Sequence, residues 1–300
     1  MNTLRGYITL TRPANLPTAI ADIMAGAAVS LAMTYPDVFT DLNIGRFARP
    51  VILLSLASVC LYASGVVFND YFDRETDAIE RPERPIPSGV VTARSAAVFG
   101  SVLMFAGIAL AFMVSTISGG IAILLGAAIL SYDSMAKQST VLGPLNMGVC
   151  RGLNLLLGMS VIGFPVMWWM ALIPVMYIGA ITLVSRGEVN GSNRSHIRVA
   201  FLLYILVVAL VAGLYRYGLT SMWYTLPFII VFCLMILIPL WWAYRENTPD
   251  NIRRAVKAGV ISLILLDACI AVIFAGWQAG LSVVLLLPLS LWLSRRFAVT

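Results

Sequence analysis

The chain contains 300 residues, of which 60% are hydrophobic and only 11% are charged, and its formal net charge is +6. Soluble globular proteins are roughly 45–50% apolar and about 25% charged. The higher apolar fraction and lower charged fraction of this chain, with its mean hydropathy of +0.91, exclude a soluble domain. The basic residues lie almost entirely in short connections between apolar segments, a pattern typical of membrane topology rather than of nucleic-acid binding. We therefore expect an integral, multi-pass membrane protein with no nucleic-acid partner.

Apolar windows of about 20 residues, the length that a membrane-spanning helix requires, recur along the chain. They predict one all-α polytopic domain over residues 1–300, with nine transmembrane helices, or ten if the last block crosses twice. That block, about 257–294, is interrupted by the segment from Gly276 to Gly280. The other predicted spans are 15–35, 50–70, 94–114, 119–134, 141–162, 167–185, 198–215 and 222–243.

The positive charges of the loops predict the orientation of these spans. With a cytoplasmic N-terminus, most Lys and Arg residues lie in the cytoplasmic connections 71–94, 132–140, 186–197 and 244–257. The polar motifs described below then share the cytoplasmic face, and we expect a location in a bacterial inner membrane.

The most informative stretch is the acidic run from Asn69 to Asp77, where the second predicted span leaves the membrane. Asp70, Asp73 and Asp77 are spaced i, i+3 and i+7, so on a continuous helix they share one face. Like charges on one face repel each other unless a cation lies among them. Mg²⁺ is the natural candidate, because it usually binds through one or two carboxylates plus substrate phosphates. The alternative is a solvated loop of mixed charge.

A basic segment follows the acidic run and reads Arg81-Pro82-Glu83-Arg84-Pro85-Ile86-Pro87-Ser88-Gly89. The two segments together resemble the first aspartate-rich motif of the UbiA superfamily of intramembrane prenyltransferases. The run Arg12 to Asn15 before the first helix, and Tyr132 with Lys137 after the fourth, agree with this resemblance. Residues 150–154 and 185–191 are most similar to the EboC-like branch.

The resemblance implies a helical bundle around a central cavity that is open to the cytoplasmic side and to the lipid. It also implies Mg²⁺-dependent transfer of a prenyl group from a polyprenyl diphosphate to a small acceptor, with aromatic molecules among the candidates. The expected partners are thus a polyprenyl diphosphate, an unidentified acceptor and membrane lipid.

The resemblance also assigns roles to residues of this chain. Asp70, Asp73, Lys137 and Tyr132 are the expected catalytic residues. The expected metal ligands are Asn69, Asp70, Asp73, Asp77 and Glu188. The expected substrate-binding residues are Asn15, Asn69, Arg81, Arg84, Lys137, Arg151, Asn154, Arg186 and Arg194.

The chain departs from the superfamily pattern in the loop after the sixth span, where a second Asp-x-x-x-Asp cluster is normal. Residues 185–194 contain a single carboxylate, Glu188, beside Asn190 and Asn193. Asn ligates through its carbonyl oxygen but brings no charge. Arg186 and Arg194 could partly neutralise a diphosphate instead. Three outcomes stay open: one-metal catalysis, a changed substrate head group, or a non-catalytic protein that binds or carries an isoprenoid or metabolite.

Asp22, Arg151 and Asp267 fall inside predicted spans, where an unpaired charge is costly. We expect Arg151 to pair with one of the two acids across helices. The alternative places one of these acids beside the acceptor as a base. An ion-coupled transporter would also hold carboxylates near the bilayer midplane, but the main acidic cluster of this chain lies at the interface.

Overall fold

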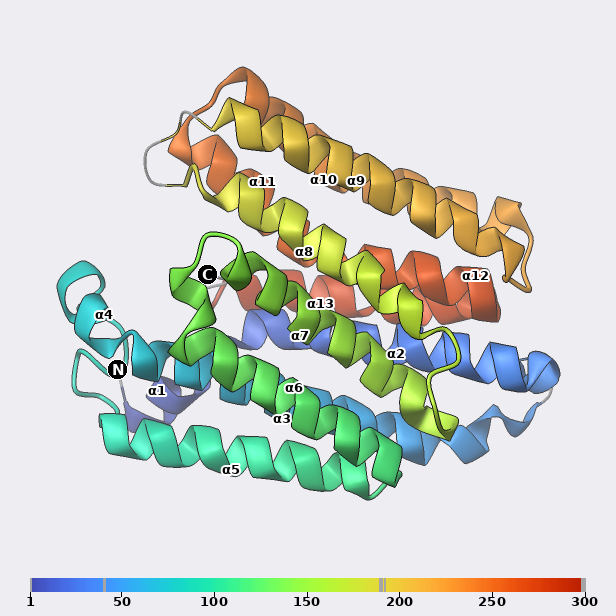
Figure 1. Cartoon of the computed structure of the whole chain (residues 1–300), viewed down its shortest axis with the longest axis horizontal. Coiled ribbons are helices and arrows are strands. Elements are labelled where there is room, and N and C mark those ends of the chain that lie inside the picture. The colour runs from blue at the N-terminus through green and yellow to red at the C-terminus, as the bar shows by residue number, and fades with distance from the viewer. Residues whose placement is uncertain (1, 40–41, 189–190, 192, 298–300) are drawn as a thin grey trace.

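The computed structural model describes residues 2–39, 42–188, 191 and 193–297. These residues form α-helices and short 3-10 helices, with no strand in the described part. The long helices lie side by side in one bundle (Figure 1). Nine helical segments of the described residues are long and apolar enough to cross a membrane, and they match the predicted spans closely. The prediction of an all-α polytopic fold is therefore confirmed.

Central and peripheral helices differ in how much of their surface the bundle covers. The most apolar windows of the first and last segments are 78% and 89% buried, whereas the corresponding window of the eighth segment is 22% buried. The first and last segments therefore form the centre, and the eighth faces lipid. The helices are α1 (Thr3–Leu10), α2 (Leu16–Thr34), α3 (Ala48–Phe72), α4 (Arg74–Glu80), α5 (Ala93–Phe112), α6 (Thr116–Ser134), α7 (Leu142–Met159), α8 (Leu172–Ser185), α9 (Arg194–Gly213), α10 (Met222–Arg245), α11 (Pro249–Ile261), α12 (Leu263–Val284) and α13 (Leu286–Ser294).

Hydroxyl side chains set where several of these helices begin. The Thr92 hydroxyl accepts a hydrogen bond from the Ser95 backbone N–H at 3.2 Å and caps α5. The Ser115 hydroxyl accepts one from the Ser118 N–H at 3.0 Å and caps α6. Such caps satisfy backbone donors that lack a partner within the helix. The cap at Ser115 marks where the uncharged run from Ser95 to Tyr132 divides into two helices.

Two glycines bring the backbones of α2 and α7 into contact. An ideal Cβ on Gly26 would lie 2.3 Å from the Leu155 carbonyl oxygen, and one on Gly158 would lie 2.6 Å from the Ile23 carbonyl oxygen. Small residues allow this close approach between transmembrane helices. The contact matters for function because α2 and α7 both contribute to the cavity described below.

We expect Gly158→Ala to destabilise the protein by about 1–3 kcal/mol, because its methyl group would overlap the α2 backbone. Gly179→Ala is the matched control, since an added Cβ there meets nothing within 4 Å. That substitution should be neutral or stabilising by up to about 1 kcal/mol through helix propensity. Thermal unfolding of the purified variants in detergent measures both effects, and equal melting temperatures would contradict the prediction.

The last apolar block, Pro249–Ser294, reverses its direction at Gly276. Gly276 has φ +85° and ψ 173°, a left-handed conformation that glycine adopts without steric penalty. Beyond it, a Cβ on Gly280 would lie 2.0 Å from the Val272 side chain, so the two arms touch. The Ser290 hydroxyl donates a 2.7 Å hydrogen bond to the carbonyl of Ala14, which precedes α2. The block therefore enters and leaves the bundle at the same end, as the ten-helix alternative requires.

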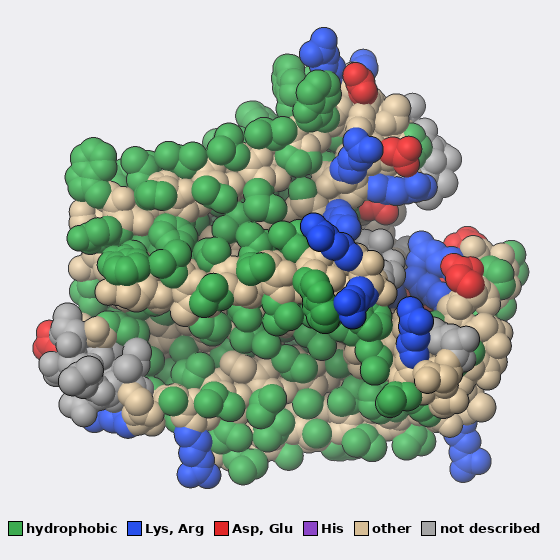
Figure 2. Space-filling model, turned by 180° about the vertical axis from the view of Figure 1, so that it is seen from behind, with side chains coloured by type: hydrophobic (Ala, Val, Ile, Leu, Met, Phe, Trp, Pro, Cys, Tyr) green, Lys and Arg blue, Asp and Glu red, His purple; other side chains and the backbone are tan. Residues whose placement is uncertain are grey.

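Charged side chains gather at one end of the bundle. Figure 2 shows Lys, Arg, Asp and Glu side chains clustered around a hollow at that end, while the side of the bundle is largely hydrophobic. The charged end includes α4 and the start of α11, whereas the long sides expose apolar residues such as Phe105 and Ile238. This distribution matches a bundle that lies in lipid and presents a polar site at one membrane surface.

Candidate functional site

A cavity of about 610 Å³ opens at the charged end, between α2, α3, α6 and α7. Its outer part is polar and includes the side chains of Asn69, Asp73 and Arg81. Its walls are apolar, with Ile129 and Leu263 among the residues that line them. An amphiphile with a charged head and a hydrocarbon chain would fit this combination.

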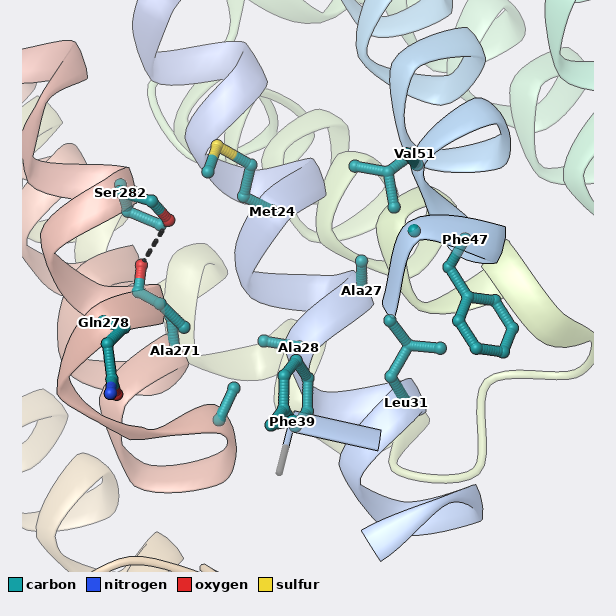
Figure 3. Close-up of a pocket in the computed structure, with 15 residues that line it drawn as sticks. Met24, Ala27, Ala28, Leu31, Phe39, Phe47, Val51, Ala271, Gln278 and Ser282 are labelled. Carbon is teal, nitrogen blue, oxygen red and sulfur yellow. Dashed lines mark hydrogen bonds between the residues drawn. The ribbon is translucent and has the colours of Figure 1, made fainter. Parts of the chain in front are cut away.

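A second cavity, of about 520 Å³, lies toward the other end of α2 and α12 (Figure 3). Met24, Leu31 and Phe47 contribute apolar side chains, and Gln278 and Ser282 are the polar residues among the described lining. No charged side chain occurs in that described lining. The second cavity therefore lacks, in its described lining, the charged groups that line the first.

Arg12, Arg84, Asp70 and Asp77 are joined by three ion pairs, and we call these four residues the arginine cluster. Asp70 Oδ1 contacts Arg12 Nη2 at 2.9 Å and Arg84 Nη1 at 3.2 Å. Arg84 Nη1 also contacts Asp77 Oδ2 at 2.7 Å. The cluster ties the start of the chain to the end of α3 and to the segment after α4. Arg12 adopts a left-handed conformation with φ +43° immediately before Pro13.

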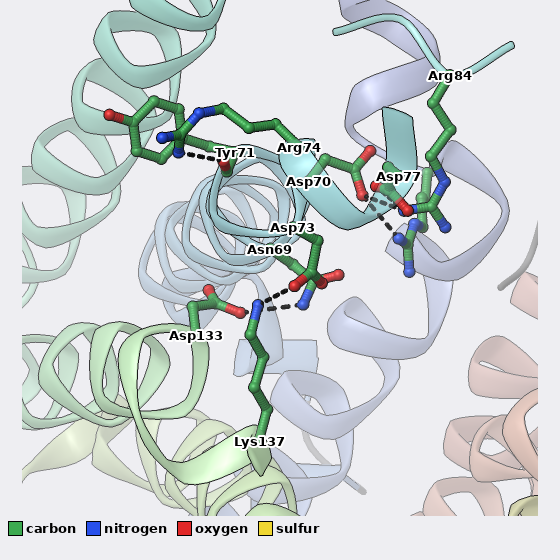
Figure 4. A network of polar contacts seen from close by, with 10 residues as sticks. Asn69, Asp70, Tyr71, Asp73, Arg74, Asp77, Arg84, Asp133 and Lys137 are labelled. Atoms are coloured by element: carbon green, nitrogen blue, oxygen red, sulfur yellow. Dashed lines mark hydrogen bonds and ion pairs between the residues drawn. The ribbon is translucent and has the colours of Figure 1, made fainter. Parts of the chain in front are cut away.

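A separate group, the lysine cluster, consists of Asn69, Asp73, Asp133 and Lys137. Lys137 Nζ lies 2.5 Å from Asp73 Oδ1, and Asn69 Nδ2 donates to Asp133 Oδ1 at 3.2 Å. Figure 4 shows these four side chains pointing toward one another from α3, α6 and the segment after each of them. Arg74 instead stacks over the Tyr71 ring, 4.9 Å from its centroid, and takes no part in either cluster.

The expected single face of carboxylates is not observed, because α3 ends at Phe72 and α4 begins at Arg74. The break at Asp73 turns its carboxylate toward Lys137, while Asp70 and Asp77 face Arg84. Asp70 is buried and is not among the described residues that line the cavity.

The described residues contain no group of three or more carboxylate, histidine or cysteine side chains already spaced for a metal ion. Oxygen donors nevertheless line the cavity on Asn69, Asp73, Asp77 and Asp133. Mg²⁺ prefers such hard donors and needs only one or two protein carboxylates when a substrate phosphate is present. The donor chemistry therefore fits Mg²⁺.

A buried polar network forms the floor of the cavity. Arg151 Nε lies 2.9 Å from Asp22 Oδ2, which confirms the predicted cross-helix ion pair. Arg151 Nη2 donates to the Thr18 carbonyl at 2.6 Å, and Asn154 Nδ2 donates to Asp22 Oδ2 at 2.8 Å. Asp267 on α12 is 3% exposed and lies close to Asp22, so α12 also contributes an acid to this floor. The floor is thus polar: Asp22, Arg151 and Asn154 bond to one another or to backbone, whereas Asp267 Oδ2 has no hydrogen-bond partner among the described residues.

The structure brings some of the remaining candidates to the cavity and turns others away. Asn15, Tyr132, Arg81 and the Arg84 side chain line the cavity, as do Arg151 and Asn154. Arg186 bonds to the Thr140 carbonyl and to His196, and Arg194 bonds to the Arg245 carbonyl at 3.2 Å. Neither Arg186 nor Arg194 is among the described lining residues.

The loop after α8 contributes one carboxylate near the site. Burial raises the pKa of the Glu188 carboxyl, and the nearby guanidinium groups of Arg253 and Arg81 oppose that shift. Asn193 donates to the Leu183 and Val184 carbonyls, so it caps the end of α8 instead of facing the cavity. Asn190 lies outside the described residues.

Asp133 is the main site residue that the sequence analysis did not identify. It is only 2% exposed and lines the cavity beside Tyr132. Its spacing of i, i+4 to Lys137 was the available signal, although α6 ends at Ser134 and Lys137 forms its ion pair with Asp73. Ser58 was also missed; its hydroxyl donates to Asn154 Oδ1 at 2.7 Å.

Comparisons with known proteins place this geometry in context. The model of the UbiA prenyltransferase family matches residues 23–264. The digeranylgeranylglyceryl phosphate synthase of Methanosarcina mazei is 33% identical over 175 residues, which cover 54% of this chain and 56% of the relative. The synthase of the same name from Methanopyrus kandleri is 32% identical over 158 residues, or 53% and 54% of the two chains. The chain thus spans just over half the length of these relatives.

Solved structures extend the likeness over nearly the whole chain. A structure of digeranylgeranylglyceryl phosphate synthase in membranes has a TM-score of 0.67 at 22% identity, covering 92% of this chain and 99% of that one. A UbiA homologue from Archaeoglobus fulgidus, bound to GPP and Mg²⁺, has a TM-score of 0.68 at 14% identity, covering 93% and 99%. The shared fold confirms the predicted all-helical bundle, and the cytoplasmic opening and the likeness to the EboC-like branch stay predictions.

Proposed function

The chain belongs to the UbiA prenyltransferase family, and from this membership we propose that it transfers a prenyl group from a polyprenyl diphosphate to a small acceptor within the membrane. One observation supports this reaction above all others. A single cavity combines cationic side chains and oxygen donors at its mouth with apolar walls below. The A. fulgidus homologue binds a substrate of the same chemical kind, a prenyl diphosphate, together with Mg²⁺.

The diphosphate head belongs at the mouth of the cavity in this proposal. Arg12, Arg81 and Arg84 line the mouth and would donate hydrogen bonds to phosphate oxygens, with Lys137 beside them. Charge builds on the diphosphate as the allylic C–O bond breaks, so preorganised cations there favour the transition state. Mg²⁺ held by Asn69, Asp73 and Asp77 would supply further neutralisation of that charge.

Asp70 has a different role from the one that the motif alone suggests. It contacts two arginines, at 2.9 and 3.2 Å, and is buried beside the cavity. We assign it to holding Arg12 and Arg84 in place for the diphosphate. Glu188 forms no ion pair with Arg81 among the described residues, and it would add only a nearby negative charge to that arginine.

The hydrocarbon chain and the acceptor occupy the inner part of the cavity in this proposal. Val66, Ile129 and Leu263 supply apolar wall for the chain. The aromatic rings of Tyr62 and Tyr132 line the same space, and aromatic rings attract the positive charge of an allylic cation. The acceptor is a small molecule, aromatic or alcoholic, that enters this space from the lipid or the membrane surface.

The charges at the site end support one membrane orientation over the other. The loops that flank the cavity carry most of the basic residues, so we place the cavity mouth at the cytoplasmic face of a bacterial inner membrane. Residues 1–300 act as a single domain in this arrangement.

One observation favours a carrier as the second candidate. The loop after α8 offers only Glu188 as a carboxylate, and its flanking arginines Arg186 and Arg194 bond to backbone carbonyls away from the cavity. Such a protein would bind a prenyl diphosphate without ionising it.

Turnover of geranylgeranyl diphosphate by the purified chain distinguishes the two candidates. We expect Mg²⁺-dependent release of diphosphate, and formation of a lipid-soluble prenylated product with a suitable acceptor. Removal of divalent cations with EDTA should abolish both and excess Mg²⁺ should restore them, because the carboxylates at the mouth otherwise repel the diphosphate. Tight binding without release, across prenyl chain lengths and an acceptor panel, would support the carrier instead.

A further inference from the structure

The aspartates in and beside the cavity mouth differ in how their charge is balanced. Asp70, Asp73 and Asp77 each have a basic side chain within 3.2 Å. Asp133 has none within 4.0 Å among the described residues, although it is the most deeply buried of these acids at 2% exposure. A buried carboxylate without a close ion-pair partner is costly, so a cation that reaches Asp133 from the cavity would be bound favourably.

The free side of Asp133 faces the cavity. Its Oδ1 accepts the hydrogen bond from Asn69 Nδ2, and the residue lines the cavity together with Asn69 and Asp73. Figure 4 shows the carboxyl groups of Asp73 and Asp133 on two sides of the Lys137 ammonium, which already places one positive charge between them. Two carboxylates and an amide oxygen are a suitable protein contribution to a Mg²⁺ site, whose other ligands are water and phosphate.

Asp133 also supplies a carboxylate to the cavity, whereas the loop after α8 contains few carboxylates. That loop contributes one carboxylate, which lies near Arg81 and Arg253, and not a pair of aspartates. A further anionic ligand could come from another element that reaches the same cavity. The C-terminal end of α6 does so, and Asp133 is the carboxylate that it presents.

We propose that Asp133 is a ligand for a divalent cation, acting with Asp73 and Asn69 in place of the carboxylates missing from the loop after α8. The proposal rests on the proposed function for the identity of the substrate phosphate, but the cation site itself does not require turnover. It makes α6, and not the loop after α8, the second source of anionic ligands.

Mn²⁺ binding measured by electron paramagnetic resonance tests this site without any reaction. The probe is Mn²⁺ alone, titrated into the full-length protein in detergent or nanodiscs. We expect Asp133→Asn to weaken Mn²⁺ binding by at least about tenfold, since loss of outer-shell partners alone lowers metal affinity by roughly 10–100-fold. Asp250→Asn is the charge-matched control, because Asp250 is an exposed carboxylate on α11 with its own partner, Arg253. Unchanged Mn²⁺ affinity in Asp133→Asn would overturn the proposal.

A second measurement uses the unmodified chain, so it does not depend on the stability of a variant. Fe²⁺ with ascorbate and peroxide cleaves a backbone near a bound metal, and mass spectrometry locates the cuts. We expect cuts near both residue 73 and residue 133. Cuts near 73 and 77 alone would overturn the proposal.

The outcomes separate this inference from the proposed function. If Mn²⁺ binding depends on Asp133 but the protein transfers no prenyl group, the cation site is supported and the proposed prenyltransferase activity is rejected. If Asp133→Asn keeps full prenyl transfer and full Mn²⁺ binding, the cation site at Asp133 is rejected and the proposed prenyltransferase activity is supported.

Discussion

Asp73→Ala is expected to lower the rate of diphosphate release by roughly 10²–10³-fold, the range seen when one group that stabilises transition-state charge is lost. Asp73 lines the cavity, and its carboxylate lies 2.5 Å from Lys137 Nζ. Removing it takes an oxygen donor from the mouth and leaves the lysine free to swing away. The measurement is the rate at saturating geranylgeranyl diphosphate and Mg²⁺.

Glu75→Ala is the control for this variant. Glu75 lies two residues away on α4, but its side chain is 85% exposed and pairs with Arg74 outside the cavity. Glu75→Ala removes one negative charge from the same membrane surface, as Asp73→Ala does. A general electrostatic effect on the rate would therefore appear in both variants. We expect Glu75→Ala to keep nearly full activity. Equal rates in Asp73→Ala and the unmodified chain would contradict the assignment of Asp73.

Arg151→Met is expected to destabilise the fold by about 3–5 kcal/mol, because it leaves buried acids without their basic partner. Arg151 is 7% exposed and Asp22 is 1% exposed, and the two are in contact at 2.9 Å. Methionine fills similar space but cannot replace the bonds to Asp22 and the Thr18 carbonyl. Denaturant unfolding in detergent, followed by circular dichroism, measures the loss.

The double variant Asp22→Asn with Arg151→Met separates the lost charge balance from the lost packing. Asn keeps the shape of the acid and removes its charge, so a large part of the stability should return. A double variant as unstable as the two single losses added together would show that the pair acts through packing alone. Prenyl transfer by the double variant then reports whether the Arg151 side chain also contacts substrate.

The bundle could be predicted from the sequence because long apolar runs must become helices in lipid, where each backbone group needs a partner within its own segment. The reversal at Gly276 was signalled by the interruption at residues 276–280, and the pairing of Arg151 by the cost of an unpaired charge inside a span. Hydropathy and charge balance predict these features, and both can be obtained from the sequence without knowledge of the tertiary contacts.

The direction of individual side chains at the site could not be predicted in the same way. The spacing of Asp70, Asp73 and Asp77 assumes an unbroken helix, but the helix ends at Phe72 and the acids divide between two clusters. Arg186 and Arg194 have suitable chemistry, yet their bonds to backbone carbonyls turn them elsewhere. Helix breaks and backbone partners depend on contacts between elements far apart in sequence.

The buried network at the cavity floor has a consequence for how the protein is made. Arg151 and the Thr18 carbonyl that it contacts are separated by 133 residues, and Asp267 follows much later still. At a synthesis rate of about 5–20 residues per second, roughly 7–27 s pass between the emergence of the two ends of this contact. Throughout that interval α2 carries Asp22 without its basic partner. We therefore expect the first span to be shielded, to stay at the membrane surface or to carry a protonated Asp22 until the fifth has been synthesised.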